Sequence, residues 1–271
     1  MTHRWIIASA MALLASAGAL ARTLDDLYEG RTIVTGRGEA NRLNGLPSCL
    51  EEVLVKVSGD PRLIGDPRLA PIEADAPQLV ASFRYHDRME GMPTRDEQGS
   101  RDRPYDLLVT FDRAKIDAVL RALGSAPWTA ERPRLAVFVA MHQAAAHYVL
   151  SSDGARGFGE RQSLAAAAVK RGLPIVLPAT AALAANGVAD DVPELSAVAE
   201  LGPAAKNLGG DAALAGRLTW VEPELGWAAE WSLVDHDVPH RWQIRGVSFD
   251  EAFRNAIGGA AQILSGHGEP P

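Results

Sequence analysis

Leu135–Met141 reads LAVFVAM, seven consecutive apolar residues without a charge or a proline. A strand of this kind offers no polar face to solvent, so we expect it inside a sheet that is covered on both faces. Helical periodicity flanks it on both sides, after Asp112 and over Gly159–Arg171. Strands alternating with helices around one buried strand predict an α/β (α+β) fold.

Downstream of this strand, the pattern predicts a C-terminal α/β unit over residues 134–271. Pro174–Leu177 indicates a short strand, and a helical stretch over about 194–208 is interrupted near Gly202 and Pro203. Three strands separated by short connections then predict an antiparallel meander over 212–220, 227–234 and 241–247. Ser248 and Glu251 form a capping-box pattern that begins a C-terminal helix.

Upstream, residues 22–124 predict a smaller unit with the order β-α-β-β-α. The strands are expected at 28–35, 79–85 and 107–111, and the first helix over 46–57, with Pro47 in its first turn. Asp112 is expected to cap the second helix, and Gly124 to end it. Residues 125–133, SAPWTAERP, are without periodicity and predict a linker between two small mixed-sheet units.

The first 21 residues have the pattern of a secretory signal peptide. Arg4 precedes an uncharged run from Trp5 to Leu20, which is short for a helix that spans a membrane. The run ends in Ala19-Leu20-Ala21, the small-x-small pattern of a cleavage site. We therefore expect cleavage after Ala21, a periplasmic location and no stable membrane insertion afterwards. An uncleaved N-terminal anchor is the alternative.

Charge and cysteine content exclude several classes of function. Removing residues 1–21 leaves 26 basic and 34 acidic residues, a net charge of −8 without any basic cluster. Such a chain lacks the electrostatic footprint of nucleic-acid binding and the polybasic patch that attracts anionic lipid. Cys49 is the only cysteine and lies in an apolar helical pattern, which indicates a buried residue rather than a nucleophile.

Four tryptophans lie within 23 residues of the predicted meander: Trp220, Trp227, Trp231 and Trp242. Along each strand they occupy the same alternating positions as the apolar residues, whereas the positions between them carry polar and charged residues. This alternation predicts a sheet with helices packed on one side and the indole rings in the core. The alternative is a surface on which indole rings stack against sugars.

The segment RDEQGSRDR is the candidate binding site. It combines three arginines and three acids without helical or strand periodicity, which indicates either a solvated loop or a polar surface that contacts a protein. The charged candidates are Arg95, Asp96, Glu97, Arg101, Asp102 and Arg103. Catalysis by a pair of carboxylates would need a buried position that shifts the pKa of one of them, and such a hydrophilic stretch is not expected to be buried.

Other motifs that could indicate a metal or phosphate site are weaker evidence of function. Asp235, His236, Asp237 and His240 have ligand chemistry but occupy an expected hairpin loop, and GARGFG before the predicted helix at 159–171 lacks the Lys and Ser/Thr of a P-loop. His142 and His147 lack the helical HExxH spacing. We expect no metal, no cofactor and no catalytic residue.

Several phrases together resemble the DUF2066 family of bacterial exported proteins: LEEVLVKVSGDPRLIGDPRL, FRYHDRM, DEQGSRDRPYDLLVTFD, RPRLAVFV and GVSFDEAFRNAIGGAAQILSGHG. The resemblance implies an envelope location but no known activity. The second unit, with GGDAALAGRLTW between helix and strand, is similar to the N-terminal domain of TolB, whose relatives hold partners rather than catalyse.

These observations favour a non-enzymatic periplasmic accessory or scaffold protein that binds another envelope protein. A binding module for a cell-wall glycan or small ligand is one alternative. A hydrolase with an unrecognised site is the other.

Overall fold

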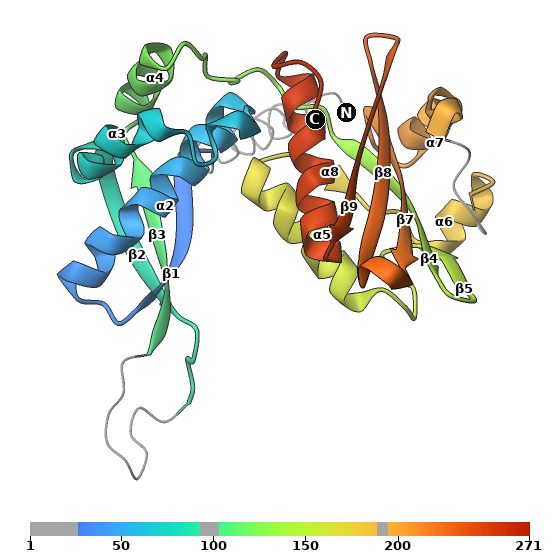
Figure 1. Cartoon of the computed structure of the whole chain (residues 1–271), viewed down its shortest axis with the longest axis horizontal. Coiled ribbons are helices and arrows are strands. Elements are labelled where there is room, and N and C mark those ends of the chain that lie inside the picture. The colour runs from blue at the N-terminus through green and yellow to red at the C-terminus, as the bar shows by residue number, and fades with distance from the viewer. Residues whose placement is uncertain (1–26, 93–102, 189–194) are drawn as a thin grey trace, which may run out of the picture. The chain divides into compact units, whose positions relative to one another are not determined.

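The computed structural model describes residues 27–92, 103–188 and 195–271 (Figure 1). The chain forms two compact units: unit 1 ends at Thr129 and omits Gly59–Pro61, which belong with Ala130–Pro271 in unit 2. Both units combine helices with strands, which confirms the predicted α/β (α+β) class. The predicted signal peptide, 1–21, lies outside the described residues.

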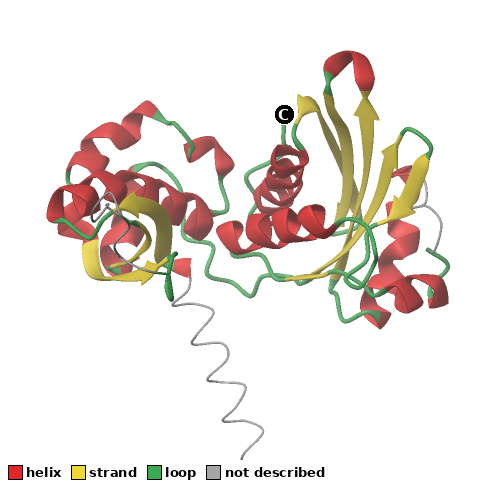
Figure 2. Cartoon of the chain, turned by 90° about the horizontal axis from the view of Figure 1, so that it is seen from below, coloured by secondary structure: helices red, strands yellow, loops and turns green. Residues whose placement is uncertain are grey.

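Unit 1 is a three-stranded antiparallel sheet in the order β1-β3-β2, with helices on one face (Figures 1 and 2). Helix α2 contributes Leu50, Val53, Leu54 and Val57 to a core completed by strand residues such as Leu107. The elements are β1 (Glu29–Thr35), α2 (Glu39–Ser58), α3 (Ala70–Ala74), β2 (Val80–Asp87), β3 (Pro104–Phe111) and α4 (Arg113–Ala122).

Helix α2 begins earlier than its apolar pattern predicts, and Pro47 lies inside it rather than in its first turn. The residues from Glu39 to Asn44 are mostly polar, so they carry no periodic signal. Pro47 has no N–H and leaves the Leu43 carbonyl without its helical donor. The helix forms nonetheless because the turns that follow bury their apolar side chains in the core of unit 1.

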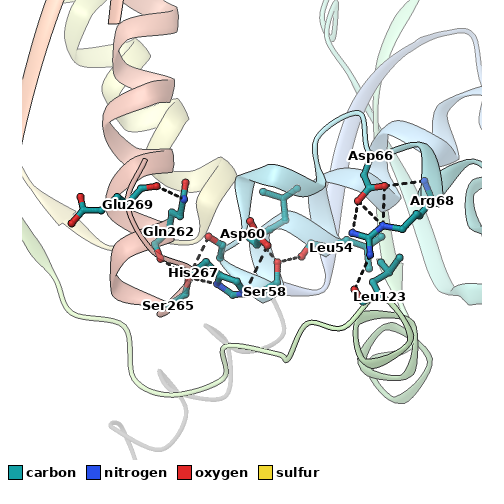
Figure 3. Close-up of polar contacts among 12 residues, drawn as sticks. Leu54, Ser58, Asp60, Asp66, Arg68, Leu123, Gln262, Ser265, His267 and Glu269 are labelled. Atoms are coloured by element: carbon teal, nitrogen blue, oxygen red, sulfur yellow. Dashed lines mark hydrogen bonds and ion pairs between the residues drawn. The ribbon is translucent and has the colours of Figure 1, made fainter. Parts of the chain in front are cut away.

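The stretch after Gly59 contains short helical turns, including Pro61–Leu63, Pro67–Leu69 and Ala76–Leu79. Asp66 caps the second of these turns by accepting a hydrogen bond of 2.9 Å from the Arg68 amide. The Arg68 guanidinium also donates to Asp66 and to the Leu123 carbonyl at 3.1 Å (Figure 3). These bonds, led by the one from the Arg68 side chain, lower the pKa of Asp66.

The outer edge of β1 is partly occupied by side chains of α2. The Tyr28 carbonyl accepts from the Phe111 amide, and the Gly36 amide donates to the Arg103 carbonyl just before β3. Because hydrogen-bonded pairs alternate along the ladder, the backbone groups of Glu29, Arg31, Ile33 and Thr35 point away from β3. Lys56 donates to the Glu29 carbonyl at 2.7 Å, and the Asn41 amide donates to the Thr35 carbonyl. Two of these four carbonyls, one at each end of the edge, are thereby satisfied.

Unit 2 contains a mixed sheet in the order β5-β4-β7-β8-β9, with β6 also paired to β4. Strands β6 and β7 run parallel to β4, and β7, β8 and β9 form the predicted antiparallel meander. The strands are β4 (Leu135–Gln143), β5 (Ala146–Val149), β6 (Ile175–Val176), β7 (Ala212–Val221), β8 (Gly226–Asp235) and β9 (Val238–Val247). The apolar run Leu135–Met141 is buried throughout, as expected of a central strand.

Helices cover both faces of this sheet (Figure 2). This agrees with the expectation from the apolar run Leu135–Met141 and corrects the expectation from the meander, whose alternation predicted helices on one side only. The second face is covered through Leu183, Val198 and Ala205, which pack in one cluster with Phe138 and Ala215. The sequence did not indicate this second apolar face, because several of its residues are alanines, whose small side chains contribute little to an apolar pattern. The helices are α5 (Phe158–Arg171), α6 (Thr180–Ala185), α7 (Gly202–Asn207) and α8 (Phe249–Leu264), with a 3₁₀ segment over Leu195–Leu201.

The capping box that begins α8 is present as predicted. The Ser248 hydroxyl accepts from the Glu251 amide at 3.2 Å, and the Glu251 carboxylate accepts from the Ser248 amide at 3.2 Å. Replacing Ser248 with alanine is expected to lower the free energy of unfolding by about 1 kcal/mol, because an amide of the first turn loses its acceptor. Chemical denaturation of the full chain measures this loss, and a variant as stable as the wild type would contradict it.

Candidate functional site: the open face of the unit 1 sheet

One face of the unit 1 sheet is packed against α2, and the opposite face is exposed along both edge strands. Strand register aligns Ile33 with Asp106, and Asp106 with His86, so side chains from three strands form rows across the sheet. We call this surface the open face. It comprises Glu29, Arg31, Ile33, Ser82, Arg84, His86, Asp106, Leu108 and Thr110.

Asp106 is the centre of the open face. Its side chain is only 3% exposed, and its carboxylate lies 2.5 Å from Nη2 of Arg31 and 3.8 Å from Nε of Arg88. A buried carboxylate is costly without such partners. The arginine side chains themselves remain 59% and 44% exposed. The site therefore holds two guanidinium groups in fixed positions while leaving much of their surface accessible.

A second ion pair crosses the sheet beside the first. Arg84 of β2 reaches Glu29 of β1 with two hydrogen bonds, of which the one from Nη2 to Oε1 is 2.9 Å. Leu108 lies between these strands in half-buried surroundings, and Ile33 is exposed. The result is a patch in which charged groups with restrained geometry surround apolar side chains, a composition that suits contact with another protein.

Of the six residues expected to bind a partner, the structure describes Arg103 alone. The other five, Arg95, Asp96, Glu97, Arg101 and Asp102, lie outside the described residues, so their role stays a prediction. Arg103 is 12% exposed, lies 3.4 Å from the Asp87 carboxylate and donates to the Met89 carbonyl. These contacts join the two ends of the hairpin between β2 and β3, which gives Arg103 a structural role.

The residues of the possible metal loop do not converge. His236 pairs with Asp235 at 2.9 Å, and that hydrogen bond raises the pKa of the imidazole. His240 instead contacts Glu269 of the C-terminal tail at 2.6 Å. The tail folds back on α8, where Gln262 donates to the Glu269 carbonyl at 2.9 Å (Figure 3). Throughout the described part of the chain, no three His, Cys, Asp or Glu side chains form a metal-binding group.

Three of the four tryptophans in the meander are buried: Trp227, Trp231 and Trp242. Trp231 is fully buried and lies 6.0 Å from Phe253 of α8, measured between ring centroids. Their indole faces are therefore occupied by core contacts rather than available to stack on a sugar.

Sequence reasoning missed the open face because its signal is distributed over three strands. Arg31, Arg84 and Asp106 lie far apart in the chain, and only the register of β1, β3 and β2 brings them together. The available signal was the presence, in each strand, of charged residues at the alternating positions opposite to the apolar core: Glu29 and Arg31 in β1, Arg84 in β2 and Asp106 in β3.

Comparison with known proteins identifies one match. Residues 21–129 match the model of a family described only as a domain of unknown function, DUF8605, which covers less than half of the chain and corresponds closely to unit 1. No curated protein matches the chain, and no solved structure does.

The resemblance to DUF2066 is therefore wrong, because the matching family is a different one. Its most specific phrase, VLVKVSGD, covers the last, buried turns of α2 and then Gly59, which follows the helix at a φ of 76°. Helix packing and the left-handed residue after the helix require such a pattern in many unrelated folds. The likeness to the TolB N-terminal domain also has no counterpart among solved structures.

Proposed function

We propose that this chain is a non-enzymatic periplasmic accessory protein whose open face binds another protein of the cell envelope. One observation carries the proposal: Arg31 and Arg88 flank the buried Asp106 on an exposed sheet face that also presents Ile33. Arginine and apolar side chains are common at protein interfaces, and guanidinium groups pair readily with carboxylates of a partner.

Two further observations support this reading. The N-terminal sequence has the pattern of an export signal, and no described helix is both long and apolar enough to cross a membrane. The ion pairs restrain the arginines before any partner arrives, so binding costs less side-chain entropy. A partner with acidic groups around an apolar side chain has the matching chemistry.

Ile33→Glu tests the proposal. Ile33 is 55% exposed, so the substitution is expected to change the stability of unit 1 little while placing a charge in the apolar part of the open face. The tagged full chain is crosslinked in the cells that produce it, and crosslinked partners are quantified by mass spectrometry. We expect the amount of crosslinked partner to fall about tenfold in the variant, which corresponds to about 1.4 kcal/mol of binding free energy.

Ile64→Glu is the matched control, because Ile64 is 51% exposed in the same unit and lies outside the open face. It should retain the crosslinked species at the wild-type level. Equal retention by both variants would refute binding through the open face. Equal loss would also refute it, since the effect would then follow from charge alone.

A further inference from the structure

Strand β2 is an edge of the unit 1 sheet, and its outer side is open (Figure 1). Arg88 donates to the Pro104 carbonyl at one end of the strand, so the alternating ladder uses every second residue of β2, including Arg84, to pair with β3. The amides and carbonyls of Phe83 and Tyr85 therefore point away from the sheet. Within the described residues, no side chain or loop bonds to these four groups, in contrast to the outer edge of β1.

We propose that this edge of β2 accepts an extended segment of the partner protein as an additional antiparallel strand, with acidic and apolar side chains in alternation. The inference rests on the proposed function, because the added strand would widen the open face. Antiparallel pairing is favoured because it is slightly more stable per residue than parallel pairing. In recognition of this kind, main-chain hydrogen bonds supply affinity and alternate side chains supply specificity.

The two faces beside β2 specify the alternation. On the open face, Arg84 and Arg88 remain exposed outside their ion pairs, so the side chains of the added strand on this face should be acidic. On the opposite face, the Phe83 ring is 44% exposed, with Cζ of Arg42 at 4.4 Å from the ring centroid. An apolar side chain opposite Phe83 would cover more of this ring.

A second copy of this chain is a poorer occupant of the edge. The antiparallel register that uses both Phe83 and Tyr85 of each copy places the two Arg84 side chains directly opposite each other. Like charges in that position are destabilising. The charges of β2 therefore favour an acidic segment of a different protein.

The probe is a synthetic peptide with the required pattern, acetyl-Thr-Glu-Val-Glu-Val-Glu-Thr-amide. In the expected register its two valines lie opposite Phe83 and Tyr85, and its central glutamate lies opposite Arg84. The isotope-labelled full chain is titrated with this peptide and followed by nuclear magnetic resonance. At saturation, the Phe83 and Tyr85 amides should exchange with solvent at least about tenfold more slowly. The Ile33 amide, on the outer edge of β1, should exchange as before.

N-methylated peptides separate strand addition from attraction between charges. Consecutive amides of an extended strand point to opposite edges. Methyl groups on both valine amides remove the donors that face β2, and we expect them to abolish binding. Methyl groups on the first two glutamate amides point away from β2 and should leave the Kd within about twofold of its value for the unmodified peptide.

A variant of the chain tests the charge pattern. Arg84→Glu should weaken binding of the unmodified peptide about fivefold or more, because it places like charges opposite each other. Arg121→Glu makes the same change of net charge at the exposed end of α4, and it should keep the parental Kd. The methylation comparison uses the unaltered chain, so it remains decisive if Arg84→Glu fails to fold.

Three results would overturn the proposal: no saturable binding, equal loss of affinity from both methylation patterns, or unchanged exchange of the Phe83 and Tyr85 amides. A dimer of the full chain that the peptide dissociates, detected by analytical ultracentrifugation, would also overturn it, since a second copy would then be the occupant. Failure of the peptide tests together with lost crosslinking in Ile33→Glu would refute strand addition and leave the proposed function standing. Peptide binding together with retained crosslinking would do the opposite.

Discussion

The Trp231→Ala variant is expected to unfold with about 3–5 kcal/mol less free energy than the wild type. Trp231 is fully buried in unit 2, where its indole ring packs near Phe253. Gly216 of β7 lies opposite, and a Cβ there would come within 2.0 Å of the indole ring, so that ring occupies the space of a missing side chain. Removing the indole leaves a cavity that the backbone has little freedom to fill.

Urea denaturation followed by near-ultraviolet circular dichroism measures this effect. Trp220→Ala is the control, because Trp220 is only partly buried at the end of β7 and should cost less. If Trp231→Ala kept the wild-type midpoint, the indole would not be part of the core and the packing argument would be wrong.

Gly30→Ala is expected to destabilise unit 1 by about 3 kcal/mol, at the upper end of typical overpacking costs. A Cβ at Gly30 would lie 2.3 Å from the carbonyl oxygen of Cys49 and 2.9 Å from its Cα. Both atoms belong to the backbone of α2, so no side-chain rotation relieves the clash. Strand β1 and helix α2 would have to move apart.

Gly38→Ala is the matched control for this variant. A Cβ at Gly38 would meet only the side chain of Asn41, at 3.7 Å, which is ordinary van der Waals contact. Thermal unfolding of the two full-length variants should therefore separate them clearly. Equal melting temperatures would show that the close approach of β1 to α2 is not a constraint on unit 1.

Local signals in the sequence predicted most of the elements correctly. Asp112 accepts from the Lys115 amide at 3.0 Å and caps α4, and Ser248 caps α8, because capping depends on residues only three positions apart. Strand β5 was missed because Ala146–Val149 is too short to show alternation. The start of α2 was missed because its first turns are polar and Pro47 suggested a boundary.

The open face was beyond the reach of such reasoning, since it depends on register between residues that are distant in the chain. Asp106 and Arg31 form an ion pair although they are 75 positions apart, and the sequence around either residue gives no sign of the contact. His142 and His147 are close in sequence, yet their stacking depends on the missed strand β5. The contacts of a polar strand residue can be predicted here only when the neighbouring strand and its register are known.

The two bonds that α2 makes to the outer edge of β1 have a consequence for self-association. An exposed strand edge is a template for another chain, and pairing gains strength from consecutive backbone hydrogen bonds. Lys56 and Asn41 already occupy the carbonyls at both ends of this edge, so an incoming strand would find acceptors only at Arg31 and Ile33. We therefore expect pairing of another strand along β1 to be weaker than at an edge whose carbonyls are all unoccupied.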